Sequence, residues 1–210
     1  MQDIRLWRFS LASTYPALDP HPIVSFDTEM LILVDDEDRE IGTMSKSACH
    51  EGQGVLHRAF SLFIFNPAGE LLVQKRSPQK LLWPNYWSNS CCSHPRSGEE
   101  TGKAATRRLS EELQLDCKIE YLYKFQYHAE YSSIGSEHEL CWVFIGASAN
   151  PARANANEVS SLRHVQPDQL DQAMQNQPEQ YTPWFRMEWE CIRSKHWAQV
   201  ESLIRHRTTF

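Results

Sequence analysis

The chain has 210 residues, 41% of them hydrophobic, and a formal net charge of −6 at pH 7. This length suits one domain with its own core, and the acidic balance argues against a general nucleic-acid-binding or membrane-binding protein. No apolar run is long enough to span a bilayer, no signal peptide is recognisable, and the six cysteines lack the spacing of a disulfide scaffold, so we expect reduced thiols in the cytoplasm.

The first half of the chain predicts short strands. Residues 30–34 form an apolar strand, and the acidic residues 35–38 form a turn after it. Residues 61–65 and 70–76 are strands that are joined by residues 66–69, Asn-Pro-Ala-Gly. Proline and glycine stand where a hairpin turn needs them, so these two strands are predicted to be neighbours.

The second half mixes helices with long strands. Apolar residues recur at helical spacing in residues 98–115. Residues 119–131 and 139–147 are rich in β-branched and aromatic side chains, which predicts two strands. Residues 168–177 predict a short helix and residues 183–206 one long amphipathic helix. Because the elements show no regular βαβ alternation, the sequence predicts an α+β domain.

The most distinctive stretch is residues 89–95, Asn-Ser-Cys-Cys-Ser-His-Pro. It places two thiols and an imidazole close together and ends on a proline, which stops a regular element. Active sites are commonly built from such groups on an irregular segment between rigid neighbours. A buried loop whose cysteines only fill space is the alternative, because free cysteine is among the most buried residue types.

Histidines and carboxylates elsewhere predict a metal site. His50 and His57 flank a glycine-containing turn, and Glu137 and Glu139 stand two apart, which points both to one face of a strand. Two adjacent carboxylates repel unless a cation or proton separates them. With His94 they would form a mixed nitrogen and oxygen site for a divalent transition metal or magnesium. Taken singly, the histidines are more simply structural and the glutamates a solvated strand edge.

Cations near the predicted element ends suggest an anion site. Arg108 and Glu112 are four apart on one helical face, for which a solvent-facing charged helix is the default reading. Lys46, Arg76 and Lys80 are ordinary surface residues when taken one at a time. Together, near a metal, they could hold a diphosphate, since ammonium and guanidinium groups both suit phosphate oxygens.

The order of these motifs closely resembles type I isopentenyl-diphosphate isomerase over roughly residues 30–205. The resemblance is carried by His50, His57, residues 89–95, Glu137-His138-Glu139 and Thr182-Pro183-Trp184. It implies a Nudix-like fold, which is a mixed β-sheet sandwiched between helices. Residues 1–28, rich in proline and aromatic side chains, would be an N-terminal extension, and residues 29–210 the isomerase domain.

The chain contains an incomplete form of the Nudix sequence signature between Ser93 and Gln114, and its departures bear on the alternative functions. Ser93 replaces its first glycine, Arg108 stands where hydrolases have a glutamate, and Gln114 replaces its last glycine. These departures weaken the case for a Nudix pyrophosphohydrolase and fit the isomerase. A non-enzymatic module, in which the metal only stabilises folding, is the second alternative.

The resemblance implies interconversion of isopentenyl diphosphate and dimethylallyl diphosphate, with an isoprenoid diphosphate as the small-molecule partner, no nucleic acid and no membrane. Monomer and homodimer both stay open. One divalent metal, Mn²⁺, Zn²⁺ or Mg²⁺, would be bound by His50, His57, His94, Glu137 and Glu139.

The remaining roles are also carried over by position. Glu112 would bind a Mg²⁺ that bridges to the diphosphate. Cys92, not Cys91, would be the catalytic thiol, and Glu139 the catalytic carboxylate, hydrogen-bonded by Tyr127. Which of the two is the acid is left open. The residues that would contact the substrate are Lys46, Arg76, Lys80, Ser93, Arg108 and Trp184. For Trp184 a place in the core is the alternative.

Overall fold

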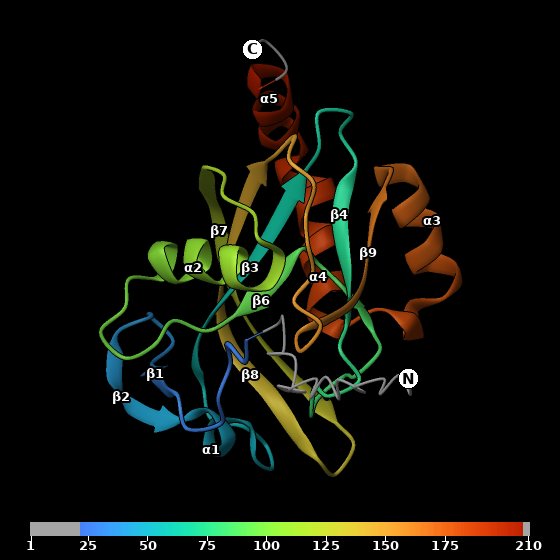
Figure 1. The fold of residues 1–210 in the computed structure, drawn as a ribbon. Coiled ribbons are helices and arrows are strands. Elements are labelled where there is room, and N and C mark those ends of the chain that lie inside the picture. The colour runs from blue at the N-terminus through green and yellow to red at the C-terminus, as the bar shows by residue number, and fades with distance from the viewer. Residues whose placement is uncertain (1–21, 208–210) are drawn as a thin grey trace, which may run out of the picture.

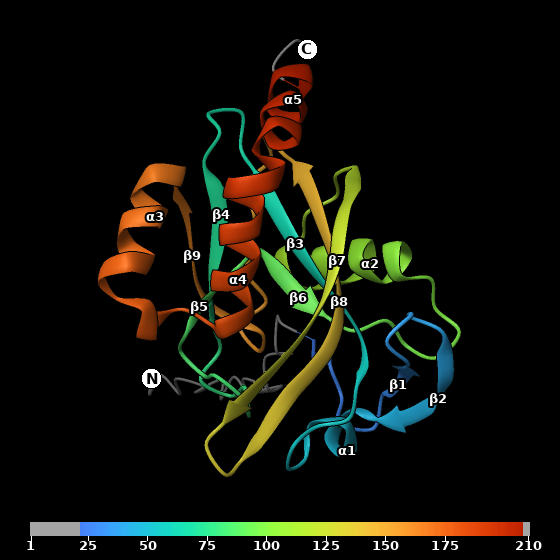
Figure 2. The ribbon, with the colours of Figure 1, turned by 180° about the vertical axis from the view of Figure 1, so that it is seen from behind.

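The computed structural model describes residues 22–207, whose strands form one mixed sheet between helices (Figures 1 and 2). Helix α2 (Thr101–Leu113) crosses one face of the sheet. Helices α4 (Pro183–Cys191) and α5 (Trp197–Arg207) cover the other face, and α3 (Pro167–Asn176) flanks them. The predicted helix–sheet–helix arrangement is therefore confirmed. Most of the predicted extension, residues 1–28, lies outside the described residues.

Strand β3 (His57–Phe65) is the centre of the sheet and is buried along almost its whole length. It runs parallel to β8 (Gly135–Ala147), with His57 opposite Glu139, and antiparallel to the short β6 (Cys91–Ser93). An apolar run without alternation is typical of a strand covered on both faces. Three chemically important segments are thereby placed side by side, although they are far apart in the sequence.

The other strands extend the sheet on both sides of β3. Strand β7 (Ile119–Tyr131) pairs with β8, while β4 (Leu71–Arg76) pairs with β9 (Val159–Val165) and β5 (Trp87–Ser88). At the lower end of Figure 1, β1 (Met30–Val34) and β2 (Glu40–Ser45) lead into the short helix α1 (Lys46–His50).

Alternation along β3 divides the core into two apolar clusters. Phe60 and Leu62 pack with α2, whereas Phe63 belongs to the cluster that includes Trp184 and Trp189 of α4. Successive side chains of a strand point to opposite faces of a sheet, so each cluster takes alternate residues. Within the described part of the chain, no helix is long and apolar enough to cross a membrane.

Several predicted elements differ from the structure. The predicted strands at 61–65 and 70–76 exist, but across their turn only Phe65 and Leu71 pair. The long C-terminal helix is interrupted by a π-helical turn, Ile192–His196. Cys91–Ser93 was predicted to be irregular and is a short strand. Two polar strands, β2 and β9, were missed because most of their side chains are exposed and give little hydrophobic periodicity.

Candidate active site

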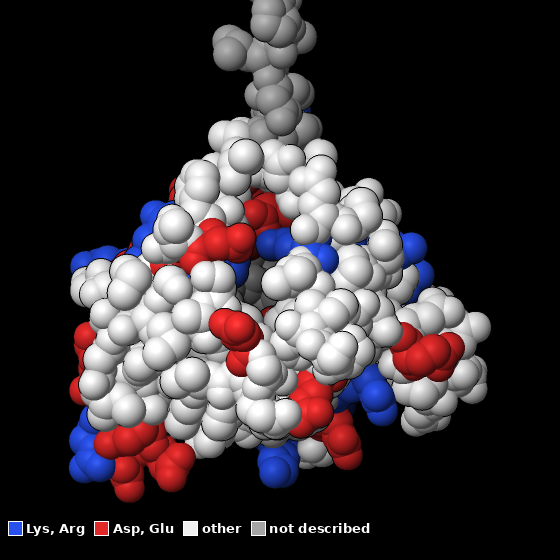
Figure 3. Space-filling model, turned by 90° about the horizontal axis from the view of Figure 1, so that it is seen from below, with Lys and Arg blue, Asp and Glu red and all other residues white. Residues whose placement is uncertain are grey.

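A pocket of about 460 Å³ opens between α1, the loop after β4 and strand β6. Figure 3 views the end of the molecule that carries α1 and shows a hollow near the middle of this face, with basic and acidic side chains along its edge. Half of the predicted site residues line the pocket: Lys46, His50, Arg76, Lys80, Cys92, Ser93 and His94.

Five residues with metal-binding side chains converge from four separate segments. One ligand atom from each lies within 4.8 Å of the others, and the residues are His50, His57, His94, Glu137 and Glu139. The two glutamates share a face of β8, as their spacing predicted. The structure therefore brings together the five residues that were predicted to bind one divalent metal.

Backbone carbonyls orient two of these imidazoles. Nδ1 of His50 lies 2.6 Å from the carbonyl oxygen of Lys46, and Nδ1 of His57 lies 2.7 Å from that of Val55. Both Nε2 atoms therefore face the carboxylates, an arrangement common to metal-bound histidines. Oε2 of Glu137 lies 2.8 Å from Nε2 of His50, whereas, among the described residues, the buried Nε2 of His57 has no hydrogen-bond partner. The donor set thus fits a divalent cation between these groups.

Burial keeps two of the imidazoles neutral, and the pKa values of the two glutamates are shifted in opposite directions. Burial lowers the pKa of His57 to about 4 and holds the pKa of His94 well below its usual value, so both imidazoles are neutral. Burial and the neighbouring Glu137 raise the pKa of Glu139. Burial also opposes ionisation of Glu137, but the contact with His50 holds its pKa well below the usual range. Neutral imidazoles are the form that binds metals.

Two side chains hold the carboxyl group of Glu139. The Tyr127 hydroxyl donates a hydrogen bond to Oε2 at 2.6 Å, and Nε2 of His94 lies 2.8 Å from Oε1. The contact between Tyr127 and Glu139 that the resemblance implied is present. Tyr127 is buried and the side chain of His94 is only 10% exposed, so these two contacts restrict the orientation of the carboxyl group.

The two adjacent cysteines face opposite sides of the sheet. Cys91 is fully buried beneath α2, whereas Cys92 is partly exposed and lines the pocket. Burial raises the pKa of Cys92 to about 12, although Nη1 of Arg76, 3.7 Å from Sγ, acts in the opposite direction. The alternative that the cysteines only fill space in the core therefore applies to Cys91 and not to Cys92.

Arg76 has more partners than the sequence suggested. Its guanidinium donates to the carbonyl oxygens of Leu82 at 2.9 Å and Trp83 at 3.1 Å, and it lies 5.3 Å from the ring centroid of Trp184. It therefore fixes the wall of the pocket near Cys92, in addition to any contact with a substrate.

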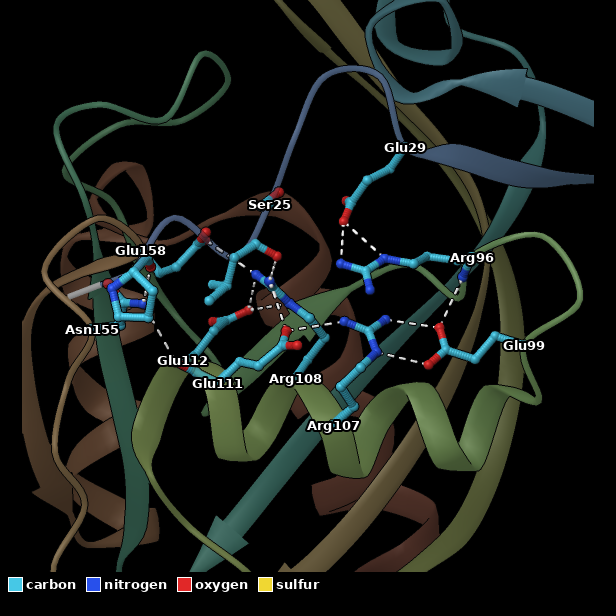
Figure 4. Close-up of polar contacts among 12 residues, drawn as sticks. Ser25, Glu29, Arg96, Glu99, Arg107, Arg108, Glu111, Glu112, Asn155 and Glu158 are labelled. Atoms are coloured by element: carbon cyan, nitrogen blue, oxygen red, sulfur yellow. Dashed lines mark hydrogen bonds and ion pairs between the residues drawn. The ribbon is translucent and has the colours of Figure 1, made fainter.

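Figure 4 shows how Arg108 is held in place. Its Nη2 lies 2.7 Å from Oε1 of Glu112 and 3.3 Å from Oε2 of Glu158, and its Nη1 donates to the carbonyl oxygen of Val24. Arg108 and Glu112 are each only 2% exposed. The default reading of this pair as a solvent-facing helix surface is therefore wrong. Glu112 lies apart from the five-residue cluster and pairs with the guanidinium.

Glu158 is a pocket residue that sequence reasoning missed. It precedes β9, is buried, and forms an ion pair with Lys80 as well as with Arg108. Burial opposes its ionisation, but these cations lower its pKa to about 2, so it stays charged. A single glutamate in a polar run carries no recognisable signal in the sequence.

Trp184 lies between the core and the site. It is 3% exposed, and its ring centroid is 5.2 Å from that of Trp83 and 6.2 Å from that of Tyr127. Its indole Nε1 has no hydrogen-bond partner in the described part of the chain. Trp184 is therefore part of the core and also a neighbour of the tyrosine that holds Glu139.

Comparisons with known proteins place this geometry in a family. Residues 55–185 match the NUDIX domain family. The chain is 43% identical to isopentenyl-diphosphate Delta-isomerase 1 of Photorhabdus laumondii subsp. laumondii, covering 82% of this chain and 99% of that protein. It is 38% identical to the isopentenyl-diphosphate Delta-isomerase of Pectobacterium atrosepticum, covering 82% and 95%.

A solved structure agrees at the level of the fold. The MutT NUDIX hydrolase from Burkholderia pseudomallei superposes with a TM-score of 0.53 at 17% identity, covering 64% of this chain and 96% of the hydrolase. At this identity the likeness concerns the fold alone. The matches to the two isomerases, in contrast, extend over nearly the whole length of those proteins. The chain therefore belongs to the family of isopentenyl-diphosphate Delta-isomerases that are built on a NUDIX domain.

Proposed function

We propose that this protein interconverts isopentenyl diphosphate and dimethylallyl diphosphate, the reaction for which its relatives are named. The observation that carries the proposal is that one pocket is lined by the Cys92 thiol, by cations that suit a diphosphate, and by His50 and His94. These two histidines belong to the candidate metal-binding cluster that contains the carboxyl of Glu139. A hydrolase needs the cations and carboxylates but no such thiol.

Two divalent cations are part of the proposal. The histidine–glutamate cluster would hold one ion, Mn²⁺, Zn²⁺ or Mg²⁺, and its donor set suits all three to different degrees. Glu112 would bind a Mg²⁺ that bridges to the diphosphate, which requires its carboxylate to exchange Arg108 for the ion. Bound ions would neutralise the buried carboxylates and the diphosphate charge.

The protein's own groups would carry the two proton transfers. One group adds a proton to the alkene, which creates a tertiary carbocation, and the other removes a proton from the neighbouring methylene. We assign these steps to Cys92 and to Glu139, whose carboxyl is oriented by Tyr127. Each such group typically contributes about 10²–10⁴-fold in rate. The cation also requires a pocket from which bulk water is excluded.

The remaining residues would bind and orient the substrate. Lys46, Lys80, Arg108, Arg76 and Ser93 would hold the diphosphate, so that the alkene lies between the two proton-transfer groups. The ring of Trp184 would face the carbocation, and a desolvated cation–π contact contributes roughly 2 kcal/mol.

The decisive experiment is incubation of isopentenyl diphosphate with the protein and Mg²⁺ in deuterated water. We expect deuterium in the allylic product and in the recovered substrate, because both proton transfers are reversible. The Cys91→Ala variant serves as a control that should still exchange deuterium. Release of inorganic phosphate without deuterium incorporation would identify a pyrophosphohydrolase instead, and neither product would identify a binding module.

The cellular setting follows from the same chemistry. We propose that residues 29–210 form the catalytic domain, that residues 1–28 are an extension of it, and that the protein acts in the cytoplasm. All six cysteines are free thiols, and a catalytic thiol is maintained by a reducing compartment.

A further inference from the structure

Two buried hydroxyl groups meet directly behind the pocket thiol. Oγ of Ser88 lies 3.1 Å from Oγ1 of Thr182, which is 94 residues away in the sequence. The same oxygen of Ser88 is 4.0 Å from Sγ of Cys92. Ser88 and Thr182 are both completely buried, so water does not compete for these contacts. The pair therefore joins the strand before Cys92 to the segment that begins α4.

The Thr182 side chain makes this contact and does not cap helix α4. It occupies the N-cap position of α4, directly before Pro183 and Trp184. A threonine there normally accepts a hydrogen bond from an N–H group in the first helical turn. Within residues 22–207 its side chain makes no such capping bond. A residue that departs from a local preference in this way commonly serves a functional arrangement.

The direction of the hydrogen bonds is fixed by the neighbouring amide. Nδ2 of Asn89 donates to the carbonyl oxygens of Cys91 at 2.8 Å and Leu62 at 3.3 Å, so Oδ1 is the acceptor for the Ser88 hydroxyl at 2.9 Å. A hydroxyl has one proton and two lone pairs. Ser88 is therefore left as an acceptor, with the Thr182 hydroxyl and the Cys92 thiol as its donors.

The backbone of the two segments is joined at the same place. The N–H group of Thr182 donates to the carbonyl oxygen of Trp87 at 2.9 Å, and Trp87 forms a parallel bridge with Tyr181. This backbone bridge fixes the position of the start of α4 relative to β5, but it does not fix the rotamers of the Ser88 and Thr182 side chains. The hydroxyl pair is what couples those side chains to the thiol.

We propose that Ser88 and Thr182 form a positioning pair that fixes the catalytic thiol of Cys92 relative to Trp184. The inference rests on the proposed isomerase function and adds two residues to it. The pair orients the thiol from behind, while the first turn of α4 carries the aromatic ring that faces the carbocation. Neither residue contacts the substrate.

The reaction makes such positioning valuable. A thiol and a carboxyl on opposite sides of a small alkene must each reach a specific carbon atom, and an error of 1 Å costs about 10²-fold in rate. A side chain that turns about one bond keeps its direction only when it has contacts on more than one side. The guanidinium of Arg76 contacts Sγ of Cys92 at 3.7 Å, and the acceptor oxygen of Ser88 adds a further contact at 4.0 Å.

The test compares Thr182→Val, which removes only the hydroxyl, with Thr182→Ser, which keeps it. We expect Thr182→Val and Ser88→Ala each to lower kcat by about tenfold to a hundredfold, while KM for isopentenyl diphosphate changes by less than about twofold. Thr182→Ser should keep kcat within about threefold of the wild type. The double variant Ser88→Ala/Thr182→Val should lose little more than the worse single variant, because both changes break one contact.

The control for lost stability is Ser90→Ala. Ser90 is a buried serine of the same loop, but its hydroxyl donates to the carbonyl oxygen of Leu72 and accepts from the N–H group of Ile64. It should lower the thermal midpoint at least as much as Ser88→Ala and keep most of kcat. If Thr182→Val does not fold, Ser88→Ala and Ser90→Ala decide the question between them.

Three results would overturn the proposal. The first is a wild-type kcat in Thr182→Val or Ser88→Ala. The second is an equal loss of kcat in Thr182→Ser and Thr182→Val. The third is a change in KM with no change in kcat. Isomerisation by the wild-type protein is measured first. If it is absent, the proposed function fails, whereas an active wild type with unaffected variants contradicts only the positioning pair.

Discussion

The site has two buried clusters of charged groups, and they are completed in different ways. In the cluster around Arg108, the guanidinium lies between Glu112 and Glu158, so the protein supplies both signs of charge. In the histidine–glutamate cluster, Glu137 and Glu139 face imidazoles, two of which, His57 and His94, burial keeps neutral.

This difference indicates what each cluster is for. In the histidine–glutamate cluster His50 pairs with Glu137 at 2.8 Å, and burial raises the pKa of Glu139, so a bound cation would stabilise the ionised form of that carboxyl. A cluster that is already paired contributes to the folded state, and one of its members must be displaced before a ligand binds. We therefore expect the histidine–glutamate cluster to bind an ion, whereas the cluster around Arg108 contributes to the folded structure and can exchange a partner.

The largest expected effect is at the histidine–glutamate cluster. Glu139→Gln would remove a proposed metal ligand and a proposed proton-transfer group at once, so isomerisation should fall by about 10⁴-fold or more. The variant should also retain less divalent metal after loading and desalting, as measured by elemental analysis. A fully active variant with an unchanged metal content would show that Glu139 is not part of this site.

The next effect concerns the two faces of β6. Cys92→Ala should abolish turnover, measured by deuterium incorporation, and should leave the thermal midpoint close to that of the wild type. Cys91→Ala should keep activity and lose about 1 kcal/mol of stability, because it removes a buried sulfur from a packed core. Equal losses of activity in the two variants would contradict the assignment of Cys92.

The paired cluster should respond in stability rather than in metal content. Arg108→Met leaves Glu112 and Glu158 buried without their counter-charge, so the free energy of unfolding should fall by about 3–5 kcal/mol in urea denaturation. Arg107→Met is the matched control. Arg107 pairs with Glu99 and Glu111 at a partly exposed position, and its loss should cost about 1 kcal/mol or less. Equal losses of unfolding free energy in the two variants would show that the buried ion pairs of Arg108 stabilise the fold no more than the exposed pairs of Arg107.

A further buried carboxyl, that of Glu188, lies outside both clusters and shows what burial does without a paired cation. Burial raises its pKa to about 8, so the folded protein keeps it protonated at neutral pH. The unfolded chain releases this proton above its ordinary pKa of 4.5, and the folded chain only near pH 8. The stability that this group provides is therefore complete below pH 4.5 and is lost as the pH rises toward 8.

Glu188→Gln should remove this pH dependence. Between pH 5 and pH 8 the wild type should lose on the order of 3 kcal/mol more stability than the variant, measured by urea denaturation at each pH. Glu190→Gln, at an exposed position of the same helix, should leave the profile unchanged. Parallel profiles for the wild type and Glu188→Gln would show that Glu188 is not protonated in the folded state.

Local patterns predicted much of this molecule. The spacing of Glu137 and Glu139 placed both carboxyls on one face, and the four-residue interval between Arg108 and Glu112 placed these two side chains on one helical face, where the structure shows them paired. These are properties of a regular strand or helix, which fix the relative direction of nearby side chains. Polar strands such as β9 were missed, because an edge strand with exposed side chains has no apolar periodicity.

The sequence by itself determined which chemical groups are present, the order of the motifs and the direction of side chains within each element. Only the tertiary structure decided that the pocket contains Glu158, that Arg108 is buried between two carboxylates, and that Thr182 reaches Ser88 instead of capping its helix. Those contacts join segments whose separation along the chain is large. Their geometry depends on how the helices and strands pack, and no local pattern of residues encodes that packing.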